Sequence, residues 1–203
     1  MRYLECFRHL AKRRNGEFVI TSAGNSGQAW WAASGDSEAS FYLDASMSLS
    51  TMFASGLALA LPKQRFWAFM GDGAFCMNPG MLMVERQMNL PNLVHFLVSN
   101  RSYGATSNAP LPSGPSCDFA MVARGMGLER VFTFSSIADL ESGLDAAITQ
   151  NASGHTFVVL EVEPFDAEEQ RLPQPPFDGP ELKYRFGRHL EMVSGATIFD
   201  YRV

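Results

Sequence analysis

Apolar residues recur along this chain in two alternating spacings, one typical of strands and one typical of helices. Short, continuous apolar runs of strand length occupy residues 18–20, 41–43, 66–70, 93–98, 131–134 and 156–163. Between these runs, helical spacing or small-residue stretches predict helices at 2–14, 28–33, 50–61, 79–88, 118–125 and 137–150. Continuous apolar runs are typical of strands that are buried on both faces. The repeated strand–helix order therefore predicts an α/β fold, a three-layer parallel sheet flanked by helices.

Polar residues are expected to fix two of the helix starts. Asp118 and Ser136 stand where two predicted helices begin, and both residue types accept hydrogen bonds from the first unpaired amides of a helix.

The composition changes near residue 163. Residues 164–180 are rich in Pro, Asp and Glu and are predicted to be a surface connector. Residues 181–191 alternate charged and apolar side chains, which predicts a helix or an arm. We therefore divide the chain into one module at residues 1–163 and a C-terminal extension at 164–203. The extension is too apolar for a free arm, so we expect it to dock on a partner, on a second copy or on its own domain.

Length and charge limit the class of protein. With 203 residues the chain is long enough for one domain with a substantial core. A net charge of −5 argues against nucleic acid as a main partner, and no apolar stretch reaches the length needed to cross a membrane. Residues 1–15 lack the apolar centre of a secretory signal. The widely spaced Cys6, Cys76 and Cys117 predict free thiols in a cytoplasmic setting.

The candidate chemistry lies directly after two of the predicted strands. Gly71-Asp72-Gly73 follows the run at 66–70, and Asn100 follows the run at 93–98. Parallel strands end at the same edge of a sheet, where open α/β folds bind ligands. A carboxylate and an amide oxygen beside glycines there suit a Mg²⁺ ion that holds a diphosphate. Ordinary turn formation is the alternative for both residues.

These residues resemble the diphosphate-binding module of thiamine diphosphate (ThDP) enzymes, whose signature is Gly-Asp-Gly followed, after a spacer, by Asn. Three further segments carry the likeness: 21–26, Ala45-Ser46-Met47-Ser48 leading into 55–62, and Asp118-Phe119-Ala120. The nearest resemblance is to the β-subunit type of the phosphonopyruvate and sulfopyruvate decarboxylases. The likeness extends from about residue 18 to 163 by the order of these motifs. An unrelated α/β domain with similar turns is the alternative.

The resemblance implies a set of site residues. Mg²⁺ would be bound by the carboxylate of Asp72, the amide oxygen of Asn100 and the backbone carbonyl of Ser102. The other residues implied to bind the cofactor belong to the two earlier motif segments or lie close to these three residues: Gly24, Asn25, Ser26, Ala45, Ser46, Met47, Gly71, Gly73, Ala74, Tyr103 and Gly104. Among them, Met47 would support the bent cofactor from below, although core filling is the usual role of a Met. The carbonyl of Ala45 would accept from the 4′-amino group.

One part of the family's site has no counterpart here. The Glu that activates the cofactor belongs to a separate pyrimidine-binding module, and no Glu of this chain matches its position. The resemblance therefore implies a subunit of a ThDP- and Mg²⁺-dependent 2-oxo acid decarboxylase that needs a pyrimidine-binding partner subunit. It also implies that the chain associates at least as a dimer, and as a heterotetramer with that partner.

Other functions stay open on the sequence. Two are enzymes, namely a carboligase of the acetolactate synthase kind and the β subunit of a 2-oxoacid oxidoreductase, and a third is a non-catalytic ThDP-binding or regulatory protein. The sequence also departs from the decarboxylases, because Leu49 stands where many of them have His. A less polar pocket favours an apolar or aromatic 2-oxo acid over sulfopyruvate.

Overall fold

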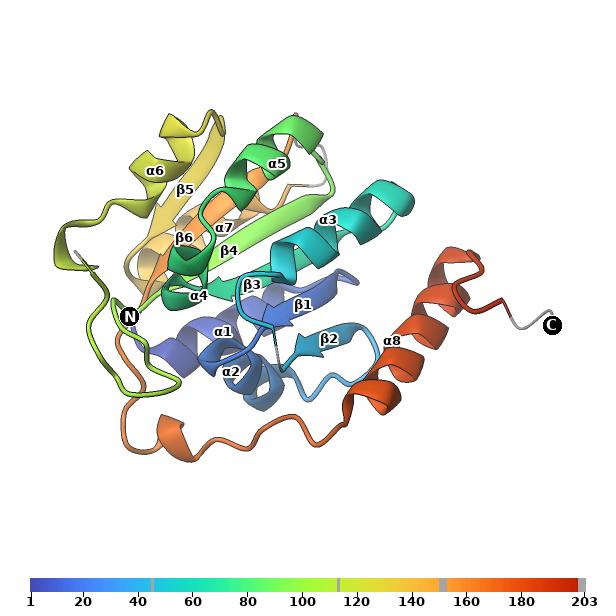
Figure 1. Ribbon diagram of the computed structural model, residues 1–203, viewed down its shortest axis with the longest axis horizontal. Coiled ribbons are helices and arrows are strands. Elements are labelled where there is room, and N and C mark those ends of the chain that lie inside the picture. Colours follow the sequence, from blue (N-terminus) through green and yellow to red (C-terminus); the bar gives the residue numbers. More distant parts are fainter. Residues whose placement is uncertain (45, 113, 150–152, 201–203) are drawn as a thin grey trace.

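A six-stranded parallel sheet forms the centre of the molecule (Figure 1). The computed structural model describes residues 1–44, 46–112, 114–149 and 153–200. The strands are β1 (Phe18–Ser22), β2 (Ser40–Leu43), β3 (Phe66–Gly71), β4 (Leu93–Ser99), β5 (Arg130–Phe134) and β6 (Thr156–Glu161). Their order across the sheet is β2-β1-β3-β4-β6-β5, and every pair is parallel. The predicted parallel α/β sheet is thereby confirmed.

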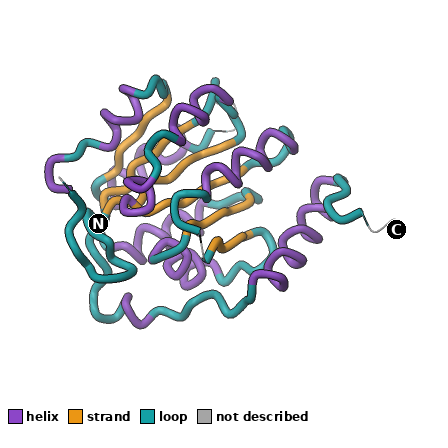
Figure 2. The backbone as a smooth tube through the Cα atoms, in the orientation of Figure 1, coloured by secondary structure: helices purple, strands orange, loops and turns teal. Residues whose placement is uncertain are grey.

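Helices cover both faces of this sheet (Figure 2). The helices are α1 (Tyr3–Arg13), α2 (Asn25–Ser34), α3 (Ser50–Ala60), α4 (Asp72–Met77), α5 (Met81–Met88), α6 (Phe119–Gly125), α7 (Ile137–Ala147) and α8 (Gly179–Ser194). Two short 3-10 turns occupy Gly114–Ser116 and Glu169–Arg171. One buried cluster joins α1, α2 and α7 to one face of the sheet. Two further buried clusters join the helices α3, α4, α5, α6 and α8 to the opposite face.

The central strands are apolar throughout because both of their faces are covered. On β3, Trp67 and Phe69 face α1 and α2, whereas Ala68 and Met70 contribute to the clusters on the other side. Phe69 stacks on Phe96 of β4 with ring centroids 4.9 Å apart. This two-sided burial is the physical reason for the continuous apolar runs in the sequence.

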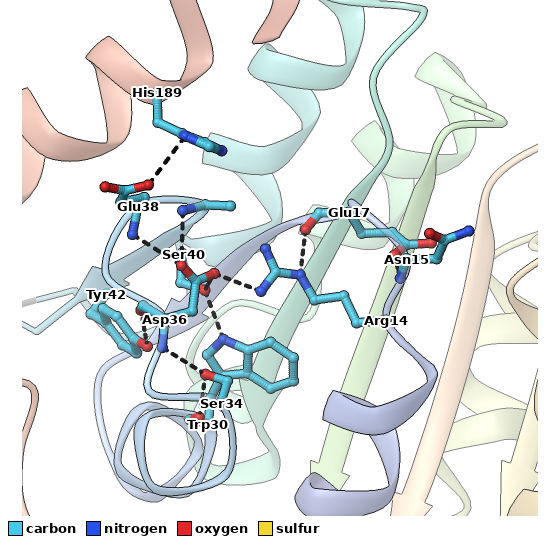
Figure 3. Close-up of polar contacts among 11 residues, drawn as sticks. Arg14, Asn15, Glu17, Trp30, Ser34, Asp36, Glu38, Ser40, Tyr42 and His189 are labelled. Carbon is cyan, nitrogen blue, oxygen red and sulfur yellow. Dashed lines mark hydrogen bonds and ion pairs between the residues drawn. The ribbon is translucent and has the colours of Figure 1, made fainter. Parts of the chain in front are cut away.

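A polar corner ties α1 and α2 to the start of β2 (Figure 3). Asp36 follows α2, and its carboxylate accepts from the guanidinium of Arg14 at 2.6 Å and from the hydroxyl of Ser40 at 2.7 Å. The backbone amides of Glu38 and Ala39 also donate to it, each at 3.0 Å. We call these five residues the Asp36 corner.

The predicted helix caps are confirmed, and several helices differ from expectation. The side chains of Asp118 and Ser136 accept from the amides of the third residue of α6 and of α7. Helix α2 begins at Asn25, before the expected start at residue 28. Helix α5 begins at Met81 and not at residue 79, and α7 ends at Ala147 and not at residue 150. Helix α4 was not predicted, because its first residues, Asp72-Gly73, have poor helix propensity and indicated a turn.

The C-terminal extension ends in a helix, α8, that packs against this chain's own sheet. Leu182, Phe186 and Leu190 are buried, and the ring of Phe186 lies edge-on to Phe18 and Phe41. His189 faces Glu38 beside the Asp36 corner, at 3.5 Å (Figure 3). Docking on a second chain stays a prediction. None of the helices in the described part of the chain combines the length and the apolarity that crossing a bilayer requires.

Candidate cofactor site

Three loops at the carboxyl edge of the sheet enclose a cavity of about 160 Å³. The first follows β1, the second is the sharp turn at Gly71-Asp72 where β3 passes directly into α4, and the third follows β4 (Figure 1). Most of the residues expected from the sequence line the cavity: Gly24, Asn25, Ser26, Met47, Gly71, Asp72, Gly73, Ala74, Asn100, Ser102, Tyr103 and Gly104. The fold therefore brings together residues that lie up to eighty positions apart (24 and 104) in the chain.

Asp72 lies at the floor of this cavity as the first residue of α4. Its side chain is 1% exposed. One carboxylate oxygen accepts from the amide of Gly73 at 2.8 Å, and the other accepts from the amide of Arg101 at 2.6 Å. Burial raises the pKa of Asp72 to about 6, against the lowering effect of these two backbone hydrogen bonds. The two direct donors are neutral dipoles, and the nearby charge of Arg101 lowers the pKa of Asp72 only in part, so burial prevails and the carboxylate is left without a full counter-charge.

The loop after β4 is held in place by Arg101. This residue adopts the left-handed backbone conformation, with φ of 62°. Its guanidinium pairs with Glu161 and donates to the backbone carbonyls of Gly114, at 2.9 Å, and Cys117. Arg101 therefore fixes both ends of the loop that carries Asn100 and the residues after it.

Asn100 and Ser102 share a tight local turn. Asn100 Oδ1 accepts from the amide of Ser102 at 3.1 Å. A Cβ placed on Gly104 would lie 2.8 Å from Asn100 Nδ2 and 3.0 Å from Asn25 Nδ2, so both amide groups approach this glycine closely. The amides of the first and third loops therefore converge.

The start of α2 offers hydrogen-bond donors to the cavity. Gly24 occupies the N-cap position and provides no side-chain cap, so the first amides of α2 lack a side-chain acceptor. Asn25 is 8% exposed, and its Nδ2 has no hydrogen-bond partner among the residues that the structure describes. An unpaired buried donor at the positive end of a helix favours an anion.

Tyr103 forms a wall of the cavity directly over the glycine motif. A Cβ on Gly73 would lie 2.7 Å from Tyr103 Cδ1, which is closer than real contacts allow. The glycine at position 73 is therefore required by the close approach of this ring.

The segment expected to contact the rings of the cofactor, residues 45–47, is seen only in part at the cavity. Met47 lines it and is 37% exposed, whereas Ser46 does not line it. The carbonyl of Ser46 accepts from the amide of Ala23 at 3.2 Å, which ties this segment to the loop after β1. The role expected for Ala45 falls outside the described residues.

Five residues of the cavity are not among the expected site residues: Ala23 and Val98, which lie in or beside the motif segments, and Tyr3, Ala105 and Thr106. Tyr3 comes from α1, and its hydroxyl lies 3.0 Å from Ser26 Oγ. Helical spacing shows that Tyr3 belongs to the buried face of α1, but no local signal indicates that its hydroxyl reaches a loop. Ala105 and Thr106 merely extend the third loop.

Comparison with known families agrees with this geometry. Residues 22–162 match the family model of the C-terminal TPP-binding domain of thiamine pyrophosphate enzymes, thiamine pyrophosphate being another name for ThDP. This chain belongs to that family. The matched residues include all three loops of the cavity. The resemblance inferred from the sequence motifs is confirmed.

Two individual proteins of named function are also similar to this chain. The chain is similar to the sulfopyruvate decarboxylase subunit beta of Methanocaldococcus jannaschii, with 28% identity over 151 residues, 74% of this chain and 77% of the relative. It is also similar to the protein of the same name from Methanococcus maripaludis, with 28% identity over 152 residues and the same two coverages.

Solved structures of longer proteins share the fold. A thiamin diphosphate-dependent enzyme from Mycobacterium smegmatis superposes with a TM-score of 0.66 and 21% identity, over 81% of this chain and 32% of the other. A thiamine diphosphate-dependent 4-hydroxybenzoylformate decarboxylase from Rhodococcus jostii RHA1 gives 0.68 and 18%, over 82% and 33%. This chain thus corresponds to about a third of each longer protein, and at these identities the likeness concerns the fold.

Proposed function

We propose that this chain is the diphosphate-binding subunit of a ThDP- and Mg²⁺-dependent 2-oxo acid decarboxylase, and that a second subunit completes the site. The single observation that carries the proposal is the meeting of Asp72, Asn100 and Asn25 around one cavity at the carboxyl edge of the sheet. The names of the two curated relatives support both the reaction class and the need for another subunit.

The cavity fits the metal-diphosphate part of the cofactor. Mg²⁺ prefers hard oxygen ligands, and Asp72, Asn100 Oδ1 and the backbone carbonyl of Ser102 are of this kind. The orphaned Nδ2 of Asn25 and the uncapped amides of α2 suit the diphosphate oxygens. A cation at Asp72 would also provide the counter-charge that the two backbone amides do not.

The same cavity is too small and too poor in acids to be a complete active site. A volume of about 160 Å³ lies below the roughly 300–1,000 Å³ of pockets that enclose a whole organic ligand. No glutamate is found among the described residues that line it. Nearby apolar side chains are partly exposed, such as Leu49 and Phe53 at 46% and 38%. We infer that the pyrimidine-binding subunit covers this surface and contributes the activating Glu.

These contacts indicate what the cofactor and the residues of this chain would each contribute to the reaction. ThDP, when bound, supplies the electron sink that accepts the electron pair released as CO₂ leaves. The residues of this chain would hold the diphosphate and metal, and Met47 lines the same cavity, where it would support the bent cofactor. Dimerisation of the chain and a heterotetramer with the partner are part of the same proposal.

The residues that line the cavity also bear on which 2-oxo acid would be the substrate. None of the described residues that line the cavity is Lys, Arg or His, so this part of the site presents no cationic side chain. Leu49 is exposed beside Met47. These two facts support an apolar or aromatic 2-oxo acid as substrate.

Calorimetry tests the cofactor assignment. Mg²⁺ with inorganic diphosphate is titrated into the chain alone, and Mg²⁺ with ThDP into the chain mixed with the pyrimidine-binding subunit. We expect Asp72→Ala to abolish the heat of binding in both titrations. The matched control is Asp139→Ala, since Asp139 is exposed on α7, and it should bind as the unmodified chain does. Unchanged binding by Asp72→Ala would disprove the metal site.

Turnover by the reconstituted enzyme tests the reaction and substrate separately. We expect CO₂ release from phenylpyruvate to exceed that from sulfopyruvate. The reverse ranking would refute the substrate preference alone. Cofactor binding without decarboxylation of either acid would favour a carboligase or a non-catalytic ThDP-binding protein.

A further inference from the structure

A second cluster of polar side chains is buried at the opposite edge of the sheet from the cofactor cavity. Glu85 comes from α5, His95 from β4, and His155 directly precedes β6. All three are almost fully enclosed, with exposures of 1%, 0% and 2%. Within the described part of the chain, this is the group of three His, Cys, Asp or Glu side chains whose ligand atoms all lie within 4.8 Å of one another.

The carboxylate of Glu85 is the centre of this cluster. Its Oε2 lies 3.0 Å from His95 Nδ1 and 2.8 Å from His155 Nε2. Each imidazole therefore directs one nitrogen at the same oxygen. His155 is fixed further by its backbone amide, which donates to Asn89 Oδ1 at 3.0 Å.

These hydrogen bonds do not satisfy the cluster. Glu85 Oε1, His95 Nε2 and His155 Nδ1 are buried and have no hydrogen-bond partner in the described structure. Such unpaired buried groups are uncommon in proteins, because each costs about 1–3 kcal/mol. The hydrogen bonds within the cluster thus use only one polar atom of each side chain, and these three facing atoms, Glu85 Oε2, His95 Nδ1 and His155 Nε2, are the ones that converge.

We propose that Glu85, His95 and His155 bind a divalent transition-metal ion of the Zn²⁺ type. Two imidazole nitrogens with one carboxylate oxygen are typical ligands of Zn²⁺, Co²⁺ and Fe²⁺, whereas Mg²⁺ prefers oxygen alone. In a tetrahedral zinc site the ligand atoms lie roughly 3.3 Å apart, given bonds of about 2.0–2.1 Å. The 2.8 and 3.0 Å separations at Glu85 would have to open slightly to admit the ion, and all three ligand atoms already lie within 4.8 Å of one another.

An open groove adjoins the cluster at His155 and is the side from which an ion would approach. His155 lines a groove of about 860 Å³ that also includes Asn89, Arg86 and Arg130. Its residues lie near the starts of β4, β5 and β6, so it belongs to the amino edge of the sheet. The site is therefore distinct from the cofactor cavity and does not depend on the function proposed for it.

Cobalt titration of the full chain tests this proposal. The chain is first freed of metal with a chelator and placed in buffer with excess Mg²⁺, and Co²⁺ is then added. We expect one equivalent of Co²⁺ to bind with a visible absorption band typical of nitrogen and oxygen ligands. Zn²⁺ should displace the band and raise the melting temperature.

Variants assign the band to the cluster. The chain has four histidines, so His9→Gln combined with His189→Gln leaves only His95 and His155. This double variant does not touch the buried cluster and should keep the band. Glu85→Gln and His155→Gln should each weaken Co²⁺ binding by at least about tenfold.

Each contrary result overturns the proposal. The absence of a stoichiometric band in the unmodified chain would mean that the cluster is hydrogen-bonded only. Loss of the band in the double variant would assign it to the surface histidines. Loss of the band in Asp72→Asn would assign it to the cofactor cavity. The titrations of the unmodified chain and of the double histidine variant test the proposal even if Glu85→Gln or His155→Gln fails to fold.

Discussion

Asp36 and Asp72 are both carboxylates at the end of a secondary-structure element, but they differ in what neutralises their charge. Asp36 accepts from a guanidinium, a hydroxyl and two backbone amides. Asp72 accepts from two backbone amides and, unlike Asp36, has no guanidinium of the described residues in direct contact with it; Ser99 and the charge of Arg101 lower its pKa as well, but less than burial raises it. Burial would raise both pKa values. For Asp36, Arg14 and the other donors outweigh burial, so its pKa falls below the usual value, whereas for Asp72 burial prevails and the pKa rises to about 6.

The difference separates a structural site from a binding site. The Asp36 corner contains its own counter-ion, so it is complete within one chain and contributes to folding. Asp72 is oriented but not fully neutralised, and in its ionised form it bears a cost that a bound cation or protonation would reduce. An incompletely compensated carboxylate in a cavity is a stronger indication of function than a buried carboxylate alone.

The largest expected effect is the loss of the Asp36 corner. Asp36→Ala removes an ion pair whose side chains are 15% and 17% exposed and leaves Arg14 without its partner. We expect the free energy of unfolding to fall by about 3 kcal/mol, measured by urea denaturation. Asp72→Asn, which removes an uncompensated charge, should leave the metal-free chain equally or more stable. Equal losses in the two variants would end the distinction between the sites.

The pH dependence of stability should have opposite signs at the two sites. The pKa of Asp36 is lowered on folding, so its contribution is present above pH 3.8 and is lost as the pH falls. The pKa of Asp72 is raised from 3.8 to about 6, so the metal-free chain is favoured below pH 3.8 and loses up to about 3 kcal/mol as the pH rises through 6.

Denaturation at several pH values between 4 and 7 measures this second effect. The difference in unfolding free energy between Asp72→Asn and the unmodified chain should grow with pH in the absence of Mg²⁺. A difference that stays constant across this range would show that Asp72 is not perturbed by folding.

Sequence reasoning succeeded where the signal was periodic or local. Buried parallel strands have continuous apolar runs, and the caps Asp118 and Ser136 act within one turn of their own helix. The meeting of Asp72 and Asn100 at one edge of the sheet could be predicted because each follows a strand, and parallel strands end together; that they bind the cofactor stays a proposal. These relations require no knowledge of how distant side chains pack.

The features that escaped prediction depend on tertiary contacts. Helix α4 forms despite Gly73 because Asp72 accepts from the Gly73 amide and Phe75 is buried beside Phe119. Tyr3 reaches the cofactor loop only through the packing of α1. His95 lies within the apolar run of β4, and no local signal indicates its polar contact, because its partner Glu85 is on another element.

A smaller effect is expected from closing the space above the glycine motif. In Gly73→Ala the added Cβ would meet the ring of Tyr103 at 2.7 Å, so the ring must move out of the cavity wall. We expect binding of Mg²⁺ with diphosphate to weaken by about tenfold, or ~1.4 kcal/mol, in calorimetry. Gly56→Ala is the matched control, because nothing lies within 4 Å of that position on α3. Equal binding by the two variants would show that the Tyr103 ring has no part in the site.

The smallest expected effect concerns the hydroxyl of Tyr3 at the carboxyl edge. Tyr3→Phe keeps the ring, which stacks on Phe7 at 5.4 Å, and removes only the hydrogen bond to Ser26 Oγ. We expect about 1 kcal/mol of lost stability, because Ser26 is buried and loses a partner. Tyr184→Phe, on the exposed face of α8, is the control and should change stability by less than about 0.5 kcal/mol. If Ser26 turns toward the diphosphate only when Tyr3 orients it, Tyr3→Phe also weakens binding of Mg²⁺ with diphosphate by a few-fold. Lost stability with unchanged binding would make Tyr3, like Asp36, a residue of the fold and not of the site.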